Sequence, residues 1–170
     1  MLKTNTQLII SVILLVLLSA CKNTYLAQPQ LDSPHHEFIN SGDVLPINTI
    51  TRLDGVEVNL QSVGNKKLVI LFATWCSDSN RLLKALNNSP LLDDSSIEII
   101  AIAREENGET VKAWRDEHDI KVPLAVDVDR SIYKKFASGG IPRIITVGEN
   151  NKVIQMSLVE GEEQLTKIFW

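Results

Sequence analysis

Residues 67–79 read Lys-Leu-Val-Ile-Leu-Phe-Ala-Thr-Trp-Cys-Ser-Asp-Ser and contain the change from strand to helix that decides the fold. Leu68 to Phe72 is an unbroken apolar run, which is typical of a central strand buried on both faces of a sheet. Ser77 to Asn88 has leucines at helical spacing and ends at Ser89-Pro90, so we expect a helix there. Cys76 therefore stands at the start of a helix. Unpaired backbone N–H groups and the positive end of the helix dipole favour a thiolate at this position.

The segments on either side alternate between strand-like and helix-like patterns. A second apolar run, Ile97 to Ala103, predicts another buried strand, and a helical pattern follows over Gly108 to His118. A turn at Asp54-Gly55 separates two short runs that are typical of a β-hairpin. The remaining expected elements are strands over 45–50, 56–60, 124–128, 144–147 and 153–158, and a short helix over 131–136.

The last residues, Glu162 to Phe169, have an amphipathic helical pattern with acidic groups in the first turn, where the helix dipole favours them. A strand–helix–strand crossover, a further helix and an antiparallel hairpin together predict an α/β domain of three layers. We expect a mixed central sheet flanked by helices, with an N-terminal β-hairpin extension.

Met1 to Ala20 has the pattern of an export signal. The run Leu8 to Ala20 holds 13 mostly apolar residues, whereas a membrane-spanning helix needs about 20, so the run fits a signal-peptide core. Leu18-Ser19-Ala20-Cys21 resembles the lipobox of bacterial lipoproteins, in which the chain is cut before a cysteine that carries lipid. The resemblance implies that acyl chains on Cys21 anchor the protein to a membrane of the bacterial cell envelope. The alternative is an ordinary secretory signal, cut near Ala20, that leaves Cys21 as a free thiol.

The chain therefore divides into a signal peptide (1–20), a lipidated N-terminus with a polar tether (21–41) and one domain (42–170). Cys21 and Cys76 are the two cysteines of the sequence, and their contexts assign them separate roles rather than one disulfide. The net charge of −4 and the lack of clustered basic residues argue against a nucleic-acid partner.

Two separate motifs carry a resemblance to a known family. Residues 67–79 resemble the active-site region of thioredoxin-like proteins, where a buried strand leads into Trp-Cys-x-x-Cys at the start of a helix. Gly139-Gly140-Ile141-Pro142, followed by a strand, resembles the cis-proline loop of that superfamily, and Leu124 to Asp129 with Tyr133 matches its lead-in. This lead-in is typical of membrane-tethered thiol–disulfide oxidoreductases, the TlpA-type redoxins, and the similarity spans about residues 41–168.

The resemblance implies roles for four residues around the thiol. Cys76 is the expected nucleophile, and Trp75 supplies an apolar rim that packs against a peptide. Ile141 and Pro142 present backbone groups to an extended partner, and we expect the bond before Pro142 to be cis. No cofactor and no metal are implied.

The departures from the family pattern constrain the chemistry. Ser79 stands where the second active-site cysteine is expected, so the site has a lone thiol that stops at a mixed disulfide. Ser79 is one helical turn from Cys76 and can donate a hydrogen bond to the thiolate. The charge of Asp78 disfavours the thiolate, and Arg81 is near enough on the same helix to offset it. Ile70 replaces the buried acid of thioredoxins, which leaves no evident proton acceptor beneath the site.

Two functions of different classes follow. The first is a thiol–disulfide oxidoreductase in which Cys76 forms mixed disulfides with protein or small thiols and an external thiol completes the cycle. The alternative is a redox-degenerate binding module that holds an extended peptide or client protein in the cis-proline groove. A thiol peroxidase is a minor alternative, because Ala73-Thr74-Trp75-Cys76 lacks the proline and the threonine spacing of the peroxiredoxin motif.

Overall fold

The computed structural model describes residues 35–170. This part of the chain contains a five-stranded sheet in the order β5-β4-β3-β6-β7 and a separate two-stranded sheet of β1 and β2. The strands are β1 Thr49–Thr51, β2 Glu57–Asn59, β3 Lys66–Phe72, β4 Ile97–Arg104, β5 Leu124–Asp127, β6 Arg143–Val147 and β7 Val153–Leu158. The helices are α2 Ser77–Asn87 and α3 Gly108–Glu117, with short 3₁₀ turns η1 Pro90–Asp93, η2 Tyr133–Lys135 and η3 Gln164–Lys167.

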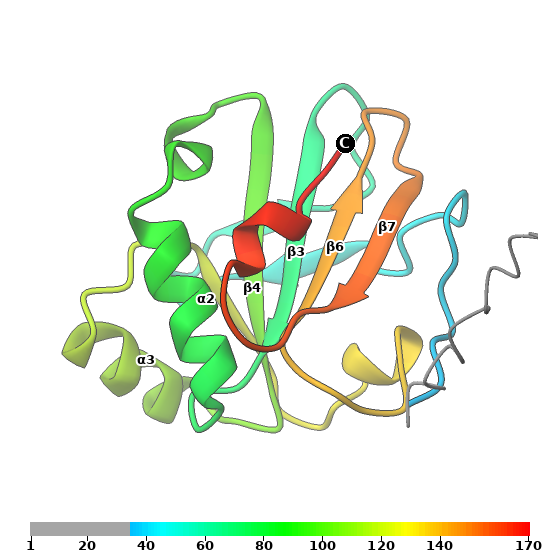
Figure 1. The fold of residues 1–170 in the computed structure, drawn as a ribbon. Helices are drawn as coiled ribbons and strands as arrows, with labels where there is room; N and C mark the ends of the chain where they lie inside the picture. The colour runs from blue at the N-terminus through cyan, green and yellow to red at the C-terminus, as the bar shows by residue number, and fades with distance from the viewer. Residues whose placement is uncertain (1–34) are drawn as a thin grey trace, which may run out of the picture. The chain divides into compact units, whose positions relative to one another are not determined.

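The sheet is mixed, as expected. β3, β4 and β5 are parallel, whereas β6 runs antiparallel to β3 and β7 antiparallel to β6. Alternate residues of β3 serve two cores: Leu68, Ile70 and Phe72 face one, and Val69 and Leu71 face the other. Figure 1 shows α2 and η3 in front of the sheet and the β1–β2 hairpin behind it. The three layers and the N-terminal hairpin confirm the predicted fold class.

The C-terminal prediction is wrong. The expected helix over 162–169 is only the single turn η3, Gln164–Lys167. Glu163 has a left-handed backbone, with φ of 56°, which an α-helix excludes. The buried side chain of Gln164 holds the turn in place, because its amide donates to the Val159 carbonyl at 2.7 Å and to the Asp78 carbonyl at 3.0 Å.

Residues 35–41, which the sequence places in the tether, lie against the domain. Glu37 forms a β-bridge with Ala137, and the Phe38 N–H donates to the Phe136 carbonyl at 2.8 Å. Cys21, the signal segment and the rest of the tether lie outside the described residues. Lipidation and the domain boundaries therefore stay predictions.

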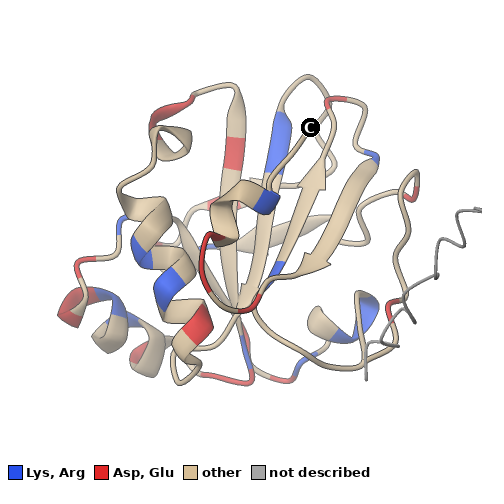
Figure 2. Cartoon of the chain, viewed as in Figure 1, with Lys and Arg blue, Asp and Glu red and all other residues tan. Residues whose placement is uncertain are grey.

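The surface of the described part carries both signs of charge. In Figure 2 the positions of basic and of acidic residues alternate along the same elements, including α2 and α3. Between residues 35 and 170, no helix has the length and apolar character needed to cross a membrane. In the same range, no three His, Cys, Asp or Glu side chains are grouped closely enough to hold a metal ion.

Candidate functional site

Cys76 is the residue from which α2 starts. It is the N-cap, with an extended backbone (φ −90°, ψ 121°), and its carbonyl accepts the Asn80 N–H at 3.0 Å. No side chain caps the helix at this position. The half-buried Sγ therefore lies at the N-terminus of α2, the positive end of the helix dipole.

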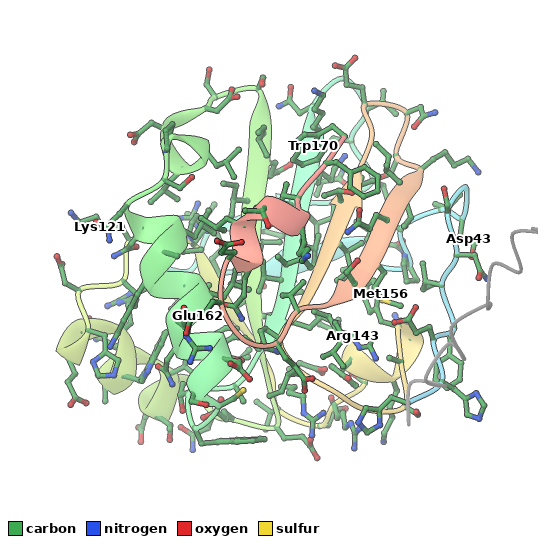
Figure 3. All side chains as sticks on the ribbon, viewed as in Figure 1. Asp43, Lys121, Arg143, Met156, Glu162 and Trp170 are labelled. Atoms are coloured by element: carbon green, nitrogen blue, oxygen red, sulfur yellow. The ribbon has the colours of Figure 1, made fainter. Side chains whose placement is uncertain are left out.

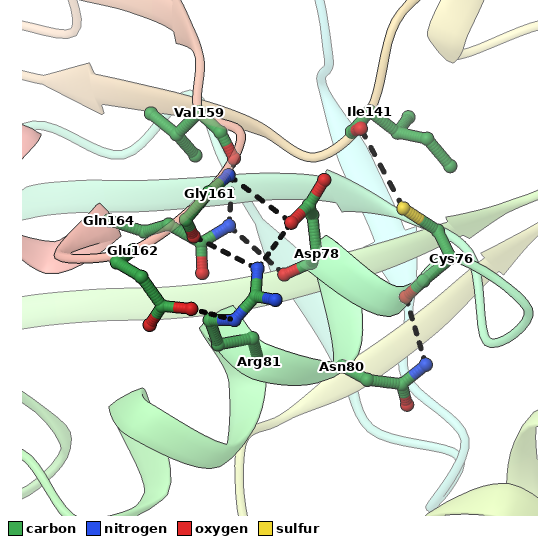
Figure 4. Close-up of polar contacts among 9 residues, drawn as sticks. All are labelled: Cys76, Asp78, Asn80, Arg81, Ile141, Val159, Gly161, Glu162 and Gln164. Atoms are coloured by element: carbon green, nitrogen blue, oxygen red, sulfur yellow. Dashed lines mark hydrogen bonds and ion pairs between the residues drawn. The ribbon is translucent and has the colours of Figure 1, made fainter.

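The cis-proline loop faces this thiol. The Ile141–Pro142 peptide bond is cis, which confirms the prediction. The Ile141 carbonyl oxygen lies 3.7 Å from the Cys76 Sγ, as Figure 4 shows. Trp75 is 66% exposed, so its ring is available to a partner. The structure thus brings Cys76 to the Ile141–Pro142 loop, while the substrate-binding roles of Trp75, Ile141 and Pro142 stay predictions.

Ser79 lies beneath the turn that carries Cys76. Its side chain is fully buried, and its hydroxyl oxygen accepts the Ala73 N–H at 3.4 Å. This contact closes the turn that carries Cys76. The hydroxyl acts there as an acceptor, so its own proton is left to donate. Its donation to a thiolate stays a prediction.

Asp78 is engaged by the C-terminal segment and not by the thiol. Its carboxylate forms an ion pair with Arg81 and accepts the Gly161 N–H at 3.2 Å (Figure 4). Arg81 also donates to the Gly161 carbonyl at 3.0 Å and lies 3.1 Å from Glu162. Arg81 therefore offsets the negative charge that we expected to disfavour the thiolate.

A buried carboxylate that the sequence did not predict lies at the site. Glu106 lies in the connection from β4 to α3 and is 8% exposed. One of its oxygens accepts the Thr74 N–H at 2.8 Å, and the other pairs with the Thr74 hydroxyl. The signal was present: β3 and β4 are parallel neighbours, so the residues that follow them meet at one edge of the sheet. Glu106 holds the turn two residues before the thiol.

Asn80 holds the same turn from the helix side. Its amide nitrogen donates to the Thr74 carbonyl at 2.7 Å and to the Cys76 carbonyl at 2.9 Å. Its amide oxygen accepts the Trp114 indole N–H at 2.6 Å, which links the turn to α3. Thr74 to Cys76 is therefore held by Asn80 of α2 and by Glu106 of the β4–α3 loop, and Trp114 of α3 fixes Asn80.

The strand that leads into Cys76 and the strand that follows Pro142 are paired neighbours in the sheet, so the thiol and the cis-proline meet at one edge. This arrangement defines a thiol protein of the thioredoxin-like fold. The chain belongs to the AhpC/TSA family, which it matches over residues 41–156.

Individual relatives are similar over most of the chain. The chain is 27% identical over 159 residues to the thiol-disulfide oxidoreductase ResA of Bacillus cereus, covering 92% of this chain and 90% of the relative. A proposed protein disulfide isomerase from Bacteroides thetaiotaomicron has a similar structure, with a TM-score of 0.69 and 26% identity over 76% of this chain and 86% of its own. A peroxiredoxin-like protein from Aquifex aeolicus, at 15% identity and a TM-score of 0.59 over 71% of this chain and 77% of its own, shares the fold alone.

Proposed function

We propose that this protein is a thiol–disulfide oxidoreductase that works with one nucleophilic thiol, that of Cys76. The observation that carries the proposal is the position of the Cys76 Sγ, at the start of α2 and 3.7 Å from the Ile141 carbonyl. The helix N-terminus favours the thiolate, and the cis-proline loop offers backbone groups to an extended partner. The similarity to relatives named as thiol–disulfide oxidoreductases supports the same reaction class.

The reaction proceeds by two exchanges. The Cys76 thiolate attacks one sulfur of a substrate disulfide, so that a mixed disulfide forms and the other substrate sulfur leaves as a thiolate. Because Ser79 supplies no second thiol, an external protein or low-molecular-weight thiol attacks the mixed disulfide. This second exchange forms a new disulfide with the incoming thiol and returns the Cys76 thiolate, with no net change in the protein.

We further infer that the reaction takes place in the bacterial cell envelope. The lipobox-like Leu18 to Cys21 follows an apolar signal core, and acyl chains at Cys21 anchor the chain to a membrane. The mass of the mature N-terminus tests this part: a diacylated or triacylated Cys21 supports it, and an unmodified N-terminus contradicts it.

The experiment for the reaction compares the parent chain with Cys76→Ser. Both are mixed with a glutathionylated peptide and free glutathione, and release of the reduced peptide is followed. We expect the parent to accelerate the release and Cys76→Ser to return it to the uncatalysed rate.

Equal rates would contradict the redox proposal and favour the binding module, to which the missing second thiol at Ser79 also points. The binding module predicts that Cys76→Ser still retains the peptide in an equilibrium binding measurement. A thiol peroxidase instead predicts that the parent consumes hydroperoxide and that Cys76→Ser does not.

A further inference from the structure

Three successive carbonyls of the cis-proline loop have three different partners. The Gly139 carbonyl accepts from the Arg143 guanidinium, at 3.2 Å from Nε and 2.8 Å from Nη2. The Gly140 carbonyl accepts the Tyr133 hydroxyl at 2.6 Å. The third, that of Ile141, faces the Cys76 Sγ at 3.7 Å. The first two contacts therefore determine where the third carbonyl stands relative to the thiol.

Arg143 is a fully buried charge at the start of β6, and Figure 3 shows it beside the η2 segment. Its guanidinium forms an ion pair with Glu37, whose side chain is 40% exposed. A buried guanidinium is stable only with a counter-ion and with acceptors for its N–H groups. Glu37 supplies the charge and Gly139 supplies an acceptor. The Glu37 carboxylate thus compensates the charge of the Arg143 guanidinium, and that guanidinium binds the Gly139 carbonyl of the loop.

The backbone of the N-terminal segment is bonded to the residues just before the loop. The His36 N–H donates to the Ser138 hydroxyl at 2.8 Å, and the Ser138 N–H donates to the His36 carbonyl at 2.9 Å. The His35 ring packs so closely that a Cβ on Gly139 would lie 2.5 Å from its Nδ1, so a side chain at this position would require the His35 ring to move. Residues 35–38 are therefore packed against the loop that faces Cys76.

We propose that Glu37 and Arg143 form a positioning pair for the chemistry of Cys76. The segment 35–38 then helps to hold the cis-proline loop in the position in which Cys76 reacts with an extended peptide. The pair touches no substrate; it acts by setting the Gly139–Ile141 carbonyls against the thiol. This inference rests on the proposed exchange reaction. A displacement of about 1 Å in a reacting arrangement costs on the order of a hundredfold in rate, so loss of the pair is expected to slow exchange with an extended peptide.

The test uses the full chain with Glu37→Gln, and Asp54→Asn as the matched control. Asp54 is a carboxylate of similar exposure, 44% against 40%, that pairs with Arg52 in the hairpin turn. Two rate constants of Cys76 are measured, one with a peptide disulfide and one with iodoacetamide, which needs no groove. Hydrogen exchange of the Ser138 amide reports whether the segment still holds the loop.

We expect Glu37→Gln to slow the peptide reaction by about tenfold or more, to leave alkylation unchanged and to speed Ser138 exchange, with no effect of Asp54→Asn. An unchanged peptide rate overturns the positioning role, whether or not Ser138 exchange changes. If the parent itself does not react with the peptide disulfide, the proposed function fails separately. Ser138 protection then decides this inference, and unchanged protection in Glu37→Gln overturns it.

Discussion

Cys76 is positioned by the backbone around it, and that backbone is held by a small number of side chains. Glu106 and Asn80 both bind Thr74, and Ser79 binds Ala73 from below. The thiol itself contacts only the Ile141 carbonyl among the hydrogen bonds of the described residues. Its reactivity therefore depends on residues that carry no sulfur and touch no substrate.

Replacing Glu106 tests this dependence. In Glu106→Leu both acceptors of Thr74 are removed, so its N–H and its hydroxyl lose their partner inside a buried site. A charged hydrogen bond contributes about 1.5–3 kcal/mol, and we expect the free energy of unfolding in urea to fall by at least that amount. The exposed neighbour Glu105 is the control, because Glu105→Gln removes only surface ion pairs, worth at most about 1 kcal/mol. Equal losses in the two variants would contradict the role of Glu106.

Replacing Ser79 by cysteine tests whether the missing second thiol is what prevents an intramolecular disulfide. In a Cys21→Ser background, Ser79→Cys places thiols at the N-cap and one turn into α2. We expect glutathione disulfide to convert this pair into an intramolecular disulfide with no free thiol, because the second thiolate displaces glutathione from Cys76. Thiol titration and mass measure the outcome. A stable glutathione adduct on Cys76 beside a free thiol at position 79 would show that the groove, and not only the residue, has diverged.

At the scale of elements, the conformation of the C-terminal segment is determined by its contacts with α2 and not by its own amphipathic pattern. Gln164 and Gly161 both bond to Asp78 in the first turn of α2. The left-handed backbone of Glu163 makes the bend that brings them there. An amphipathic pattern is a local signal, and here tertiary contacts outweigh it.

A residue that tolerates the left-handed region should relieve that bend. Asparagine adopts this conformation more readily than glutamate, so Glu163→Asn is expected to stabilise the chain by about 0.5–1 kcal/mol. Glu160→Asn removes the same charge from an exposed neighbour and should leave stability unchanged. Thermal unfolding of both variants measures the difference. A loss of stability in Glu163→Asn would contradict the account of this turn.

β3 contains a buried lysine, Lys67, whose titration changes the free energy of unfolding with pH. Lys67 is fully buried, and its ammonium donates to the Ser62 carbonyl at 2.6 Å. Burial lowers the pKa of Lys67 below its usual 10.5, and the charge of Glu98 on β4 only partly opposes this. Between the lowered pKa and 10.5 the unfolded chain binds more protons than the folded chain, so the free energy of unfolding contributed by Lys67 rises with pH.

The measurement is urea unfolding of the parent and of Lys67→Met between neutral pH and pH 10.5. Subtracting the variant removes the titration of all other groups. We expect the stability of the parent relative to Lys67→Met to increase across this range. A relative stability that falls with pH would mean that the folded protein favours the charged ammonium.

For the whole molecule, the sequence predicted the strands, helices and turns that have a periodic or local pattern. It did not predict side-chain contacts between residues that are far apart in the chain. The run 68–72 and the leucine spacing of 77–88 indicated β3, α2 and the place of Cys76 between them. Pro142 was predicted as cis because its motif is local. The contacts of Glu106 with Thr74 and of Trp114 with Asn80 were not predicted, because the two residues of each contact lie 32 and 34 positions apart in the sequence.

Arg143 shows the same limit at the groove. Arg143 stands directly after Pro142 and before an apolar strand, and the structure shows it fully buried, which the sequence did not predict. Its partner, Glu37, is 106 residues away in a stretch that the sequence assigns to the tether, so this ion pair could not be predicted from the sequence.

The central claim is that Cys76 begins a disulfide exchange that another thiol must finish. The most direct measurement follows thiol release when the Cys21→Ser chain, in which Cys76 is the one remaining cysteine, is mixed with an excess of a peptide disulfide whose leaving thiolate is coloured. We predict a burst of one leaving group per Cys76, absent in Cys76→Ser, then no further release until glutathione is added and turnover begins. Continuous release without an added thiol, or no burst at all, would contradict the account.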